Sequence, residues 1–395
     1  MMKNILVINH FPTVNPPTSG GTLRYYHLYK ELSRYYNINL LSQTLGHKSG
    51  LFPYSPTFRE YKVEKDPLYN EQRDDFQIGK ENSYEFTLIK HIKLSYQNTV
   101  YKRYFNNLYK SSDIIIHESP FLLGYDQYLG IDGKMRIYNS HNHEYGLANQ
   151  IWTNEKAKEF LPILYVEEKK LVECADLVFT TSENERESFI DIYHKNQNQI
   201  KLAPNGIHPD TWIKKITETS NKKPKAMFIG SEYLPNIEAV DFIINQLADK
   251  CVDLDFIIAG GCCNPFIKMR KTNVKFLGRI HHKQKLRIFE EADLAINPIM
   301  SGAGVNLKTL EFLSAGIPLF STEFGVRGLN LIDHNHYIHV ERENFAIKLN
   351  DYYQKEAFLK EVASNGQKYI NDNFTWNKIA KGIQEEIEGF KPSNL

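Results

Sequence analysis

The sequence lacks the features that mark several large classes of protein. It contains four cysteines in 395 residues and no C-x-x-C pair, so we interpret Cys174, Cys251, Cys262 and Cys263 as reduced thiols. The adjacent Cys262 and Cys263 fit a buried structural role better than a redox-active one. No apolar run approaches the roughly 18 residues of a membrane span, and the first run, Ile5 to Ile8, is too short for a secretory signal. We therefore expect a cytoplasmic protein.

Charge and composition narrow the possibilities further. Lys and Arg number 48 against 47 Asp and Glu, a formal charge of +1, whereas a dedicated nucleic-acid binder usually carries a strongly basic domain. Hydrophobic residues make up 42% and aromatic residues 13% of the chain, which is enough for buried cores and argues against disorder. At about 150 residues per domain, the length predicts two or three domains.

Short β-rich apolar runs alternate with helical patterns, which predicts parallel sheets joined by crossover helices. The alternation occurs in two series. In the first series we expect strands at 4–8, 38–42, 113–117, 135–139 and 177–181, and helices at 21–35, 158–175 and 183–193. In the second we expect strands at 225–230, 255–260, 274–278, 294–298, 317–321 and 337–340, and helices at 236–247, 282–292, 306–315 and 344–353.

The boundary between the two series predicts how the chain is organised. Turn residues at 204–206 and the polar stretch 217–225 separate the series, so we expect a hinge between 205 and 224. The expected fold class is α/β, with two facing Rossmann-like doubly wound domains and an interdomain cleft. The expected parts are an N-terminal domain at 1–205, a C-terminal domain at 206–375, and a C-terminal helix at 376–395 that could pack back on the first domain.

The most informative segment is 297–328, which contains a glycine-rich loop followed by a helix. Gly302 and Gly304 would let the backbone approach a ligand closely, and the helix start offers free N–H groups and a positive dipole end. Lys308 could neutralise a diphosphate, and Glu311 could accept hydrogen bonds from ribose hydroxyls. The alternative is an ordinary exposed Lys–Glu pair on a surface helix.

Three further segments lie at the carboxyl ends of predicted strands and could contribute to a binding site. The loop from His10 to Thr22 contains Gly20 and Gly21 but lacks the G-x-G-x-x-G fingerprint, so a classical NAD site is not expected. The polar run 139–144 includes two histidines and a glutamate; a metal site is disfavoured because no further ligand set is evident. We favour His141 as a cleft residue.

The last of these segments opens the second sheet. Gly230 and Ser231 stand where its first strand should end, facing the expected cleft. Asn236 is a reasonable N-cap for the following helix. A plain strand-to-helix turn is the alternative interpretation.

Taken together, these motifs resemble the retaining nucleotide-sugar glycosyltransferases with the two-domain GT-B fold, most like glycosyltransferase family 4. The resemblance covers nearly the whole chain. The motifs that carry it are HNHE after a first-domain strand, ADLVFTTSENE, PNGI, FIGSEYLPN, FLGRI, EADLAINP and GAGVNLKTLEFLSAGIP. No single motif is decisive, but the order and spacing of the set are specific.

The resemblance implies a role for particular residues. Glu311 would bind the donor ribose, and Lys308 with the loop from Gly302 through Ala303, Gly304 and Val305 to Asn306 would hold the diphosphate and the transferred sugar. The motif Gly278, Arg279 and Ile280 would border the nucleobase, with Gly230 and Ser231 nearby. Gly20 and Gly21 would approach the diphosphate from the other domain. The residues expected in catalysis are His141, beside the reacting sugar, together with Glu311 and Lys308.

The chain also departs from the common family pattern. Ala303 stands where the first motif glutamate is usual, Ser231 and Asn236 stand where a basic pair is usual, and Asn306 stands where one branch of the family has arginine. Two alternatives therefore stay open: a catalytically inactive nucleotide-sugar binding protein, and a nucleotide-sugar epimerase on the same scaffold.

The resemblance implies a hexosyltransferase-type reaction in surface polysaccharide or glycoconjugate synthesis. The donor would be a nucleotide diphosphate sugar and the acceptor a glycan or lipid-linked hydroxyl, with no cofactor and no metal required. Segment 86–112 carries five basic residues, no acidic residue and interleaved tyrosines. It would suit peripheral contact with the inner face of a membrane; the alternative is a solvated helix whose aromatic face lies in the core.

Overall fold

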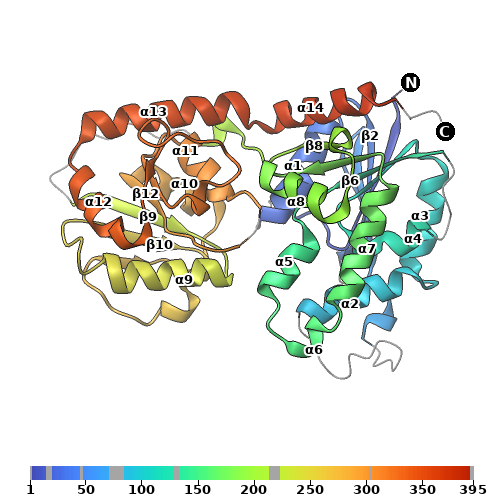
Figure 1. Cartoon of the computed structure of the whole chain (residues 1–395), viewed down its shortest axis with the longest axis horizontal. Coiled ribbons are helices and arrows are strands. Elements are labelled where there is room, and N and C mark those ends of the chain that lie inside the picture. Colours follow the sequence, from blue (N-terminus) through green and yellow to red (C-terminus); the bar gives the residue numbers. More distant parts are fainter. Residues whose placement is uncertain are drawn as a thin grey trace. The chain divides into compact units, whose positions relative to one another are not determined.

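The computed structural model describes residues 2–14, 20–44, 48–70, 84–127, 133–212, 223–302 and 304–391. Contacts divide the chain into two compact units (Figure 1). The first comprises Met1–Pro204 together with Ile379–Leu395, and the second comprises Asn205–Lys378. The chain therefore passes between the units twice, once after Pro204 and once after Lys378.

The first unit is built on an eight-stranded sheet in the order β3-β4-β2-β1-β5-β6-β7-β8. Neighbouring strands run parallel except β3 and β4, which are antiparallel. The order reverses at β1, which pairs with both β2 and β5, so the carboxyl ends of β1 and β5 form a topological switch point. The strands are β1 Asn4–Asn9, β2 Asn37–Thr44, β3 Gly50–Ser55, β4 Phe58–Glu64, β5 Ile114–His117, β6 Met135–Asn139, β7 Leu177–Thr180 and β8 Ile200–Leu202.

Helices cover this sheet. Strand side chains alternate between its two faces, so each face carries apolar side chains that must be buried. Leu6 and Ile8 of β1 share a buried cluster with Tyr101 and Phe105, whereas Ile5 points to the opposite face and is equally buried. The helices of the unit are α1 Gly20–Leu32, α2 Tyr84–Ser95, α3 Val100–Lys110, α4 Leu123–Gln127, α5 Glu144–Ile151, α6 Glu155–Lys158, α7 Leu161–Cys174 and α8 Glu183–Tyr193.

The second unit contains a six-stranded parallel sheet in the order β11-β10-β9-β12-β13-β14. This is the Rossmann order, with its switch point between β9 and β12. The strands are β9 Lys225–Ile229, β10 Asp255–Ala259, β11 Val274–Phe276, β12 Leu294–Asn297, β13 Leu319–Ser321 and β14 Ile338–His339. The helices are α9 Leu234–Phe242, α10 His282–Glu291, α11 Leu307–Ser314, α12 Phe345–Tyr352 and α13 Glu356–Asn373. The predicted fold class, two doubly wound α/β domains, is confirmed.

Both faces of the second sheet are buried, and successive residues of β9 show this directly. Phe228 belongs to a core cluster that includes Val240 of α9, while its neighbour Met227 belongs to a separate cluster that includes Leu310 of α11. Helix α9 accordingly covers one face, and α10 and α11 cover the other (Figure 1). This sandwich fixes the strand ends, and with them the loops that follow.

The final helix, α14 Trp376–Gly389, begins in the second unit and continues into the first. From Ile379 onward its residues belong to the first unit. Its buried positions there include Ile383 and Ile387, and Glu386 forms an ion pair of 2.9 Å with Lys201.

Candidate functional site

At the carboxyl edge of the second sheet, the ends of β9 and β10 are packed backbone against backbone. Gly260 has φ +100°, and a Cβ at this position would come within 2.0 Å of the Gly230 carbonyl oxygen. Its N–H donates to the carbonyl of Gly278 at 2.7 Å. A Cβ at Gly230 would in turn lie 2.7 Å from Cγ of Asn236. Both positions therefore require glycine. At Gly230, the Asn236 side chain occupies the space in which a larger side chain would lie.

Asn236 does not cap a helix, so that prediction is wrong. Helix α9 begins earlier, at Leu234, because Pro235 suits the first turn of a helix and Tyr233 takes the N-cap position. The Asn236 side chain instead donates to the Ser231 carbonyl at 3.1 Å and accepts from Lys308 at 2.5 Å. The residue thus links the end of β9 to helix α11.

The glycine-rich loop precedes α11 in backbone conformations that favour glycine. Gly302 has φ +118° and Gly304 has φ +62°; Ala303 lies outside the described residues. Asn306 occupies the N-cap position of α11, but its side chain donates to the Gly325 carbonyl at 3.2 Å rather than to the helix. The N–H groups of the first turn consequently have no side-chain cap, as expected for a helix start that receives an anion.

Lys308 lies on the first turn of α11 in a confined environment. Its Nζ donates to Asn236 Oδ1 at 2.5 Å and lies 4.3 Å from the ring centroid of Phe228. Burial lowers the pKa of this lysine to about 7. The negative charge of Glu311 favours its charged form, whereas the cationic side chains of Arg327 and Lys285 oppose it. The ammonium group is therefore ready to gain a negatively charged partner.

Glu311 is buried, with 6% of its surface exposed. One turn along α11 from Lys308, it pairs with Lys285 of α10 at 2.6 Å rather than with Lys308. Lys285 also lies over the Trp212 ring, 5.1 Å from its centroid. The alternative of an exposed Lys–Glu surface pair is therefore wrong, because the two residues have different partners and Glu311 is enclosed.

The other residues predicted for this unit lie around the same edge. Arg279 is exposed and pairs with Glu232 at 3.0 Å, and Ile280 packs against a core cluster. Ser231 is exposed, and Val305 is buried. The structure thus brings Gly230, Ser231, Lys308 and the glycine-rich loop together, with Glu311 one turn further along α11.

In the first unit, His141 follows β6 and bonds to a residue that the sequence analysis missed. Its Nε2 is hydrogen-bonded to Oε2 of Glu118, which directly follows β5. A Cβ at Gly21 would lie 3.9 Å from Nδ1 of His141 and 3.4 Å from the Phe11 ring. Gly21 therefore lies close to His141, while the neighbouring Gly20 opens α1 and is exposed.

Glu118 is the centre of a buried polar network. One carboxylate oxygen accepts from Tyr29 and, at 2.7 Å, from Asn139; Asn139 in turn accepts from Arg24 at 2.8 Å. Burial alone would raise the pKa of Glu118, but the charge and hydrogen bond of His141, with help from Tyr29 and Arg24, lower it below the usual value. Its position directly after a predicted strand was the signal that could have revealed it.

The described parts of the chain contain no group of three or more His, Cys, Asp and Glu side chains arranged to hold a metal ion. Cys251, Cys262 and Cys263 are buried as free thiols, and Cys174 is partly buried. No described helix is long and apolar enough to cross a bilayer.

Segment 86–112 forms α2 and α3, and its aromatic residues divide between core and surface. Tyr101, Phe105 and Tyr109 are buried in the sheet-covering cluster. Arg103, Tyr104 and Lys110 of α3 are exposed. The aromatic face expected by the alternative interpretation is thus present, together with a smaller exposed basic and aromatic strip.

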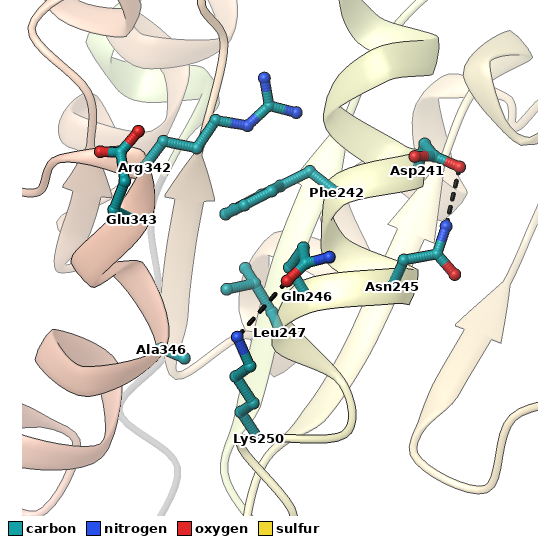
Figure 2. A pocket seen from close by; sticks show the side chains of 9 residues that line it. All are labelled: Asp241, Phe242, Asn245, Gln246, Leu247, Lys250, Arg342, Glu343 and Ala346. Atoms are coloured by element: carbon teal, nitrogen blue, oxygen red, sulfur yellow. Dashed lines mark hydrogen bonds between the residues drawn. The ribbon is translucent and has the colours of Figure 1, made fainter.

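A separate surface depression lies between the carboxyl-terminal part of α9 and the start of α12 (Figure 2). Its lining includes Phe242, Lys250, Arg342 and Glu343. None of these belongs to the predicted site, because Asn236 lies near the opposite end of α9. We assign this depression no part in donor binding.

The whole chain is similar to solved structures with two Rossmann-like domains. Sucrose-phosphate synthase from Thermosynechococcus elongatus superimposes with a TM-score of 0.73 at 16% identity, covering 98% of both chains. The E. coli trehalose-6-phosphate protein bound with UDP-2-fluoro glucose gives 0.70 at 13% identity, covering 99% of this chain and 100% of that one. Anabaena HepE in complex with UDP and glucose gives 0.66 at 13% identity, covering 98% and 100%. The fold is GT-B.

Sequence comparison finds a family match in the second unit. Residues 223–355, within the second unit, match the family described as glycosyl transferases group 1. A Klebsiella pneumoniae protein described as an uncharacterized 44.6 kDa protein in the cps region is 21% identical over 304 residues, covering 71% of this chain and 75% of that protein. The family match lies in the unit that carries Lys308 and Glu311.

Proposed function

We propose that this protein is a glycosyltransferase that moves a sugar from a nucleotide diphosphate sugar to an acceptor hydroxyl with retention at the anomeric carbon. The observation that carries the proposal is the arrangement at the β9/β12 switch point. There a lysine with a lowered pKa and an uncapped helix start lie beside a buried carboxylate, all within the segment that matches the family. Solved relatives with UDP or UDP-sugars bound support the donor class.

Each group has a proposed task. The N–H groups at the start of α11 and the Lys308 ammonium stabilise the negative charge that develops on the leaving diphosphate. Glu311, held by Lys285, accepts hydrogen bonds from the donor ribose. The loop from Gly302 to Asn306 and the segment from Gly230 to Ser231 approach the donor through their backbone, and Gly278, Arg279 and Ile280 border the base.

We further propose front-face transfer without an enzymic nucleophile. The bond between the anomeric carbon and the diphosphate oxygen breaks as the acceptor oxygen forms a bond on the same face. The acceptor proton passes to the departing diphosphate, so atoms and charge balance without a cofactor. His141, oriented by Glu118, contacts the transferred sugar, and Gly20 with Gly21 approaches the diphosphate.

The match to a protein from a cps region bears on the biological setting. The relative from a cps region supports a role in surface polysaccharide or glycoconjugate synthesis, with the first unit serving the acceptor and the second unit the donor. We propose a cytoplasmic protein that contacts the membrane through the exposed strip Arg103, Tyr104 and Lys110. Sedimentation with vesicles should depend on anionic lipid, and binding that is equal for neutral vesicles would contradict this contact.

The function is tested in two steps. Thermal unfolding with UDP-, GDP- and ADP-sugars identifies the donor, because a ligand that binds only the folded state raises Tm. Turnover of that donor is then compared among wild type, Lys308→Ala and Glu311→Gln. Glu291→Gln is the matched control, since Glu291 also pairs with a lysine of the same unit, Lys225, at 2.9 Å on the exposed surface.

We expect both site variants to lose transfer, with the control unchanged and all variants folded. Product analysis should show the anomeric configuration of the donor retained in a glycosylated acceptor. Donor binding without turnover would favour the inactive binding protein, and an isomerised nucleotide sugar without an acceptor would favour the epimerase. Full activity of both site variants would overturn the site assignment.

A further inference from the structure

One cationic side chain at the carboxyl edge of the second sheet has no role in the function proposed so far. Arg327 follows β13, the neighbour of β12 in the sheet, and so comes from the same edge as the glycine-rich loop. Its Nη2 lies 3.6 Å from the position that a Cβ on Gly302 would occupy. Tyr233 and Pro235 lie 3.7 and 3.8 Å from the same point. The guanidinium therefore lies directly beside the loop proposed to hold the diphosphate.

The turn that carries Arg327 is fixed to the helix start. The Gly325 carbonyl accepts hydrogen bonds from Thr309 at 2.7 Å and from Asn306 at 3.2 Å. Nη1 of Arg327 donates to the Phe324 carbonyl at 2.8 Å, and the guanidinium lies 4.0 Å from the centroid of the Phe324 ring. These contacts hold a planar, permanently charged donor group in a defined orientation.

The cationic side chains around this edge favour the binding of an anion. Arg327 and Lys285 both disfavour the charged form of Lys308, and Arg327 also opposes the rise that burial causes in the pKa of Tyr233. The interaction of Arg327 with Lys308 is therefore repulsive as the structure stands. A diphosphate between the two cations would turn this repulsion into attraction for both.

We propose that Arg327 binds the diphosphate of the donor, acting with Lys308 and the N–H groups at the start of α11. This inference rests on the proposed function. It also provides a second cation at a site where Ser231, Asn236 and Asn306 are uncharged. The planar fork of N–H donors on arginine can bind two phosphate oxygens in a fixed bidentate geometry, whereas the lysine ammonium acts as a point charge.

The test compares binding of UDP, UMP and uridine, with GDP and ADP as further probes, by titration calorimetry on the full chain. The variants are Arg327→Gln, Arg327→Lys and Lys308→Ala. Arg342→Gln is the matched control, because Arg342 also lies over a phenylalanine ring in the same unit, 4.5 Å from the centroid of Phe242. Thermal unfolding verifies that each variant is folded.

We expect Arg327→Gln to raise the Kd of the diphosphate about tenfold or more, to raise that of the monophosphate less, and to leave nucleoside binding unchanged. Arg327→Lys should give an intermediate Kd, and this milder variant provides the test if Arg327→Gln does not fold. Arg342→Gln should match wild type.

The possible failures can be told apart. If Lys308→Ala weakens diphosphate binding while both Arg327 variants match Arg342→Gln, the inference is overturned and the proposed function stands. If the Arg327 variants bound the diphosphate and the nucleoside equally more weakly than wild type, the inference would also be overturned. The arginine would then only support the fold of the site. If wild type binds none of the three diphosphates, the proposed function and this inference fail together.

Discussion

Protonation of Lys308 should couple donor affinity to pH. Burial lowers the pKa of this lysine to about 7 in the unliganded protein. A bound diphosphate would supply the opposite charge that the site lacks and return the pKa toward the ordinary lysine value of about 10.4. Binding would then take up a proton wherever the free lysine is neutral, so affinity should fall as pH rises above 7.

The size of the effect follows from that pKa. Each pH unit above 7 should weaken binding up to about tenfold, or about 1.4 kcal/mol. Between pH 6.5 and 8.5 the Kd should rise roughly 25-fold, because the lysine changes from mostly charged to almost entirely neutral.

The stability of the unliganded protein should respond with the opposite sign. A lysine whose pKa is lowered on folding binds its proton more readily in the unfolded chain. Its contribution to the free energy of unfolding therefore rises with pH from about 7 toward about 10.4 and levels off below 7. As pH rises from about 7 toward about 10.4, the unliganded protein should therefore gain stability from Lys308, while the increase in Tm on donor binding should become smaller.

The assay is titration calorimetry between pH 6.5 and 8.5 with the nucleotide sugar that gives the largest thermal shift. A nucleotide sugar is preferable to a free nucleotide. The terminal phosphate of a free nucleotide titrates near pH 6 and would add its own pH dependence to the Kd. Lys308→Arg is the control, since arginine stays charged over this range and should give a nearly flat profile. A flat profile for wild type, or an equal slope for Lys308→Arg, would refute the reasoning.

Three further predictions concern groups away from Lys308. Asp126 accepts two bonds of 2.9 Å from the buried Arg136, so Asp126→Asn should lower the free energy of unfolding in urea by about 3–5 kcal/mol, and a loss below 1 kcal/mol would contradict this. Glu118→Gln should lower kcat up to about 100-fold by misplacing its histidine partner, while UDP affinity stays unchanged; the reverse pattern would exclude a positioning role. Gly260→Ala should destabilise the protein by about 1–3 kcal/mol in urea, because its Cβ would come within 2.0 Å of a carbonyl oxygen, whereas Gly382→Ala, with no atom within 4 Å, should not.

Much of the fold was predictable because both sheets consist of buried parallel strands. Such strands appear as short apolar runs between turn residues, and β6 and α8 have the predicted bounds. The hairpin of β3 and β4 was missed. Leu51 and Phe52 of β3 are exposed at 55% and 36%, so the strand has no buried apolar face that would produce a recognisable pattern.

The site was predictable where a single segment determines it and unpredictable where two segments meet. The glycine-rich loop and the start of α11 are local features, and they lie where the pattern placed them. Lys285, the partner of Glu311, lies on another helix, and only the fold brings the two together. Pro235 could have corrected the prediction for Asn236, since proline favours the first turn of a helix.

The two chain crossings have a consequence for dissecting the protein. The second unit is inserted within the first, which needs residues from Ile379 onward to complete its contacts. A fragment ending at Pro204 would lack the segment whose Ile383 and Ile387 are buried. Shortening the C-terminus should accordingly damage the unit that begins the chain, while 205–378 is the natural fragment for studying nucleotide binding in isolation.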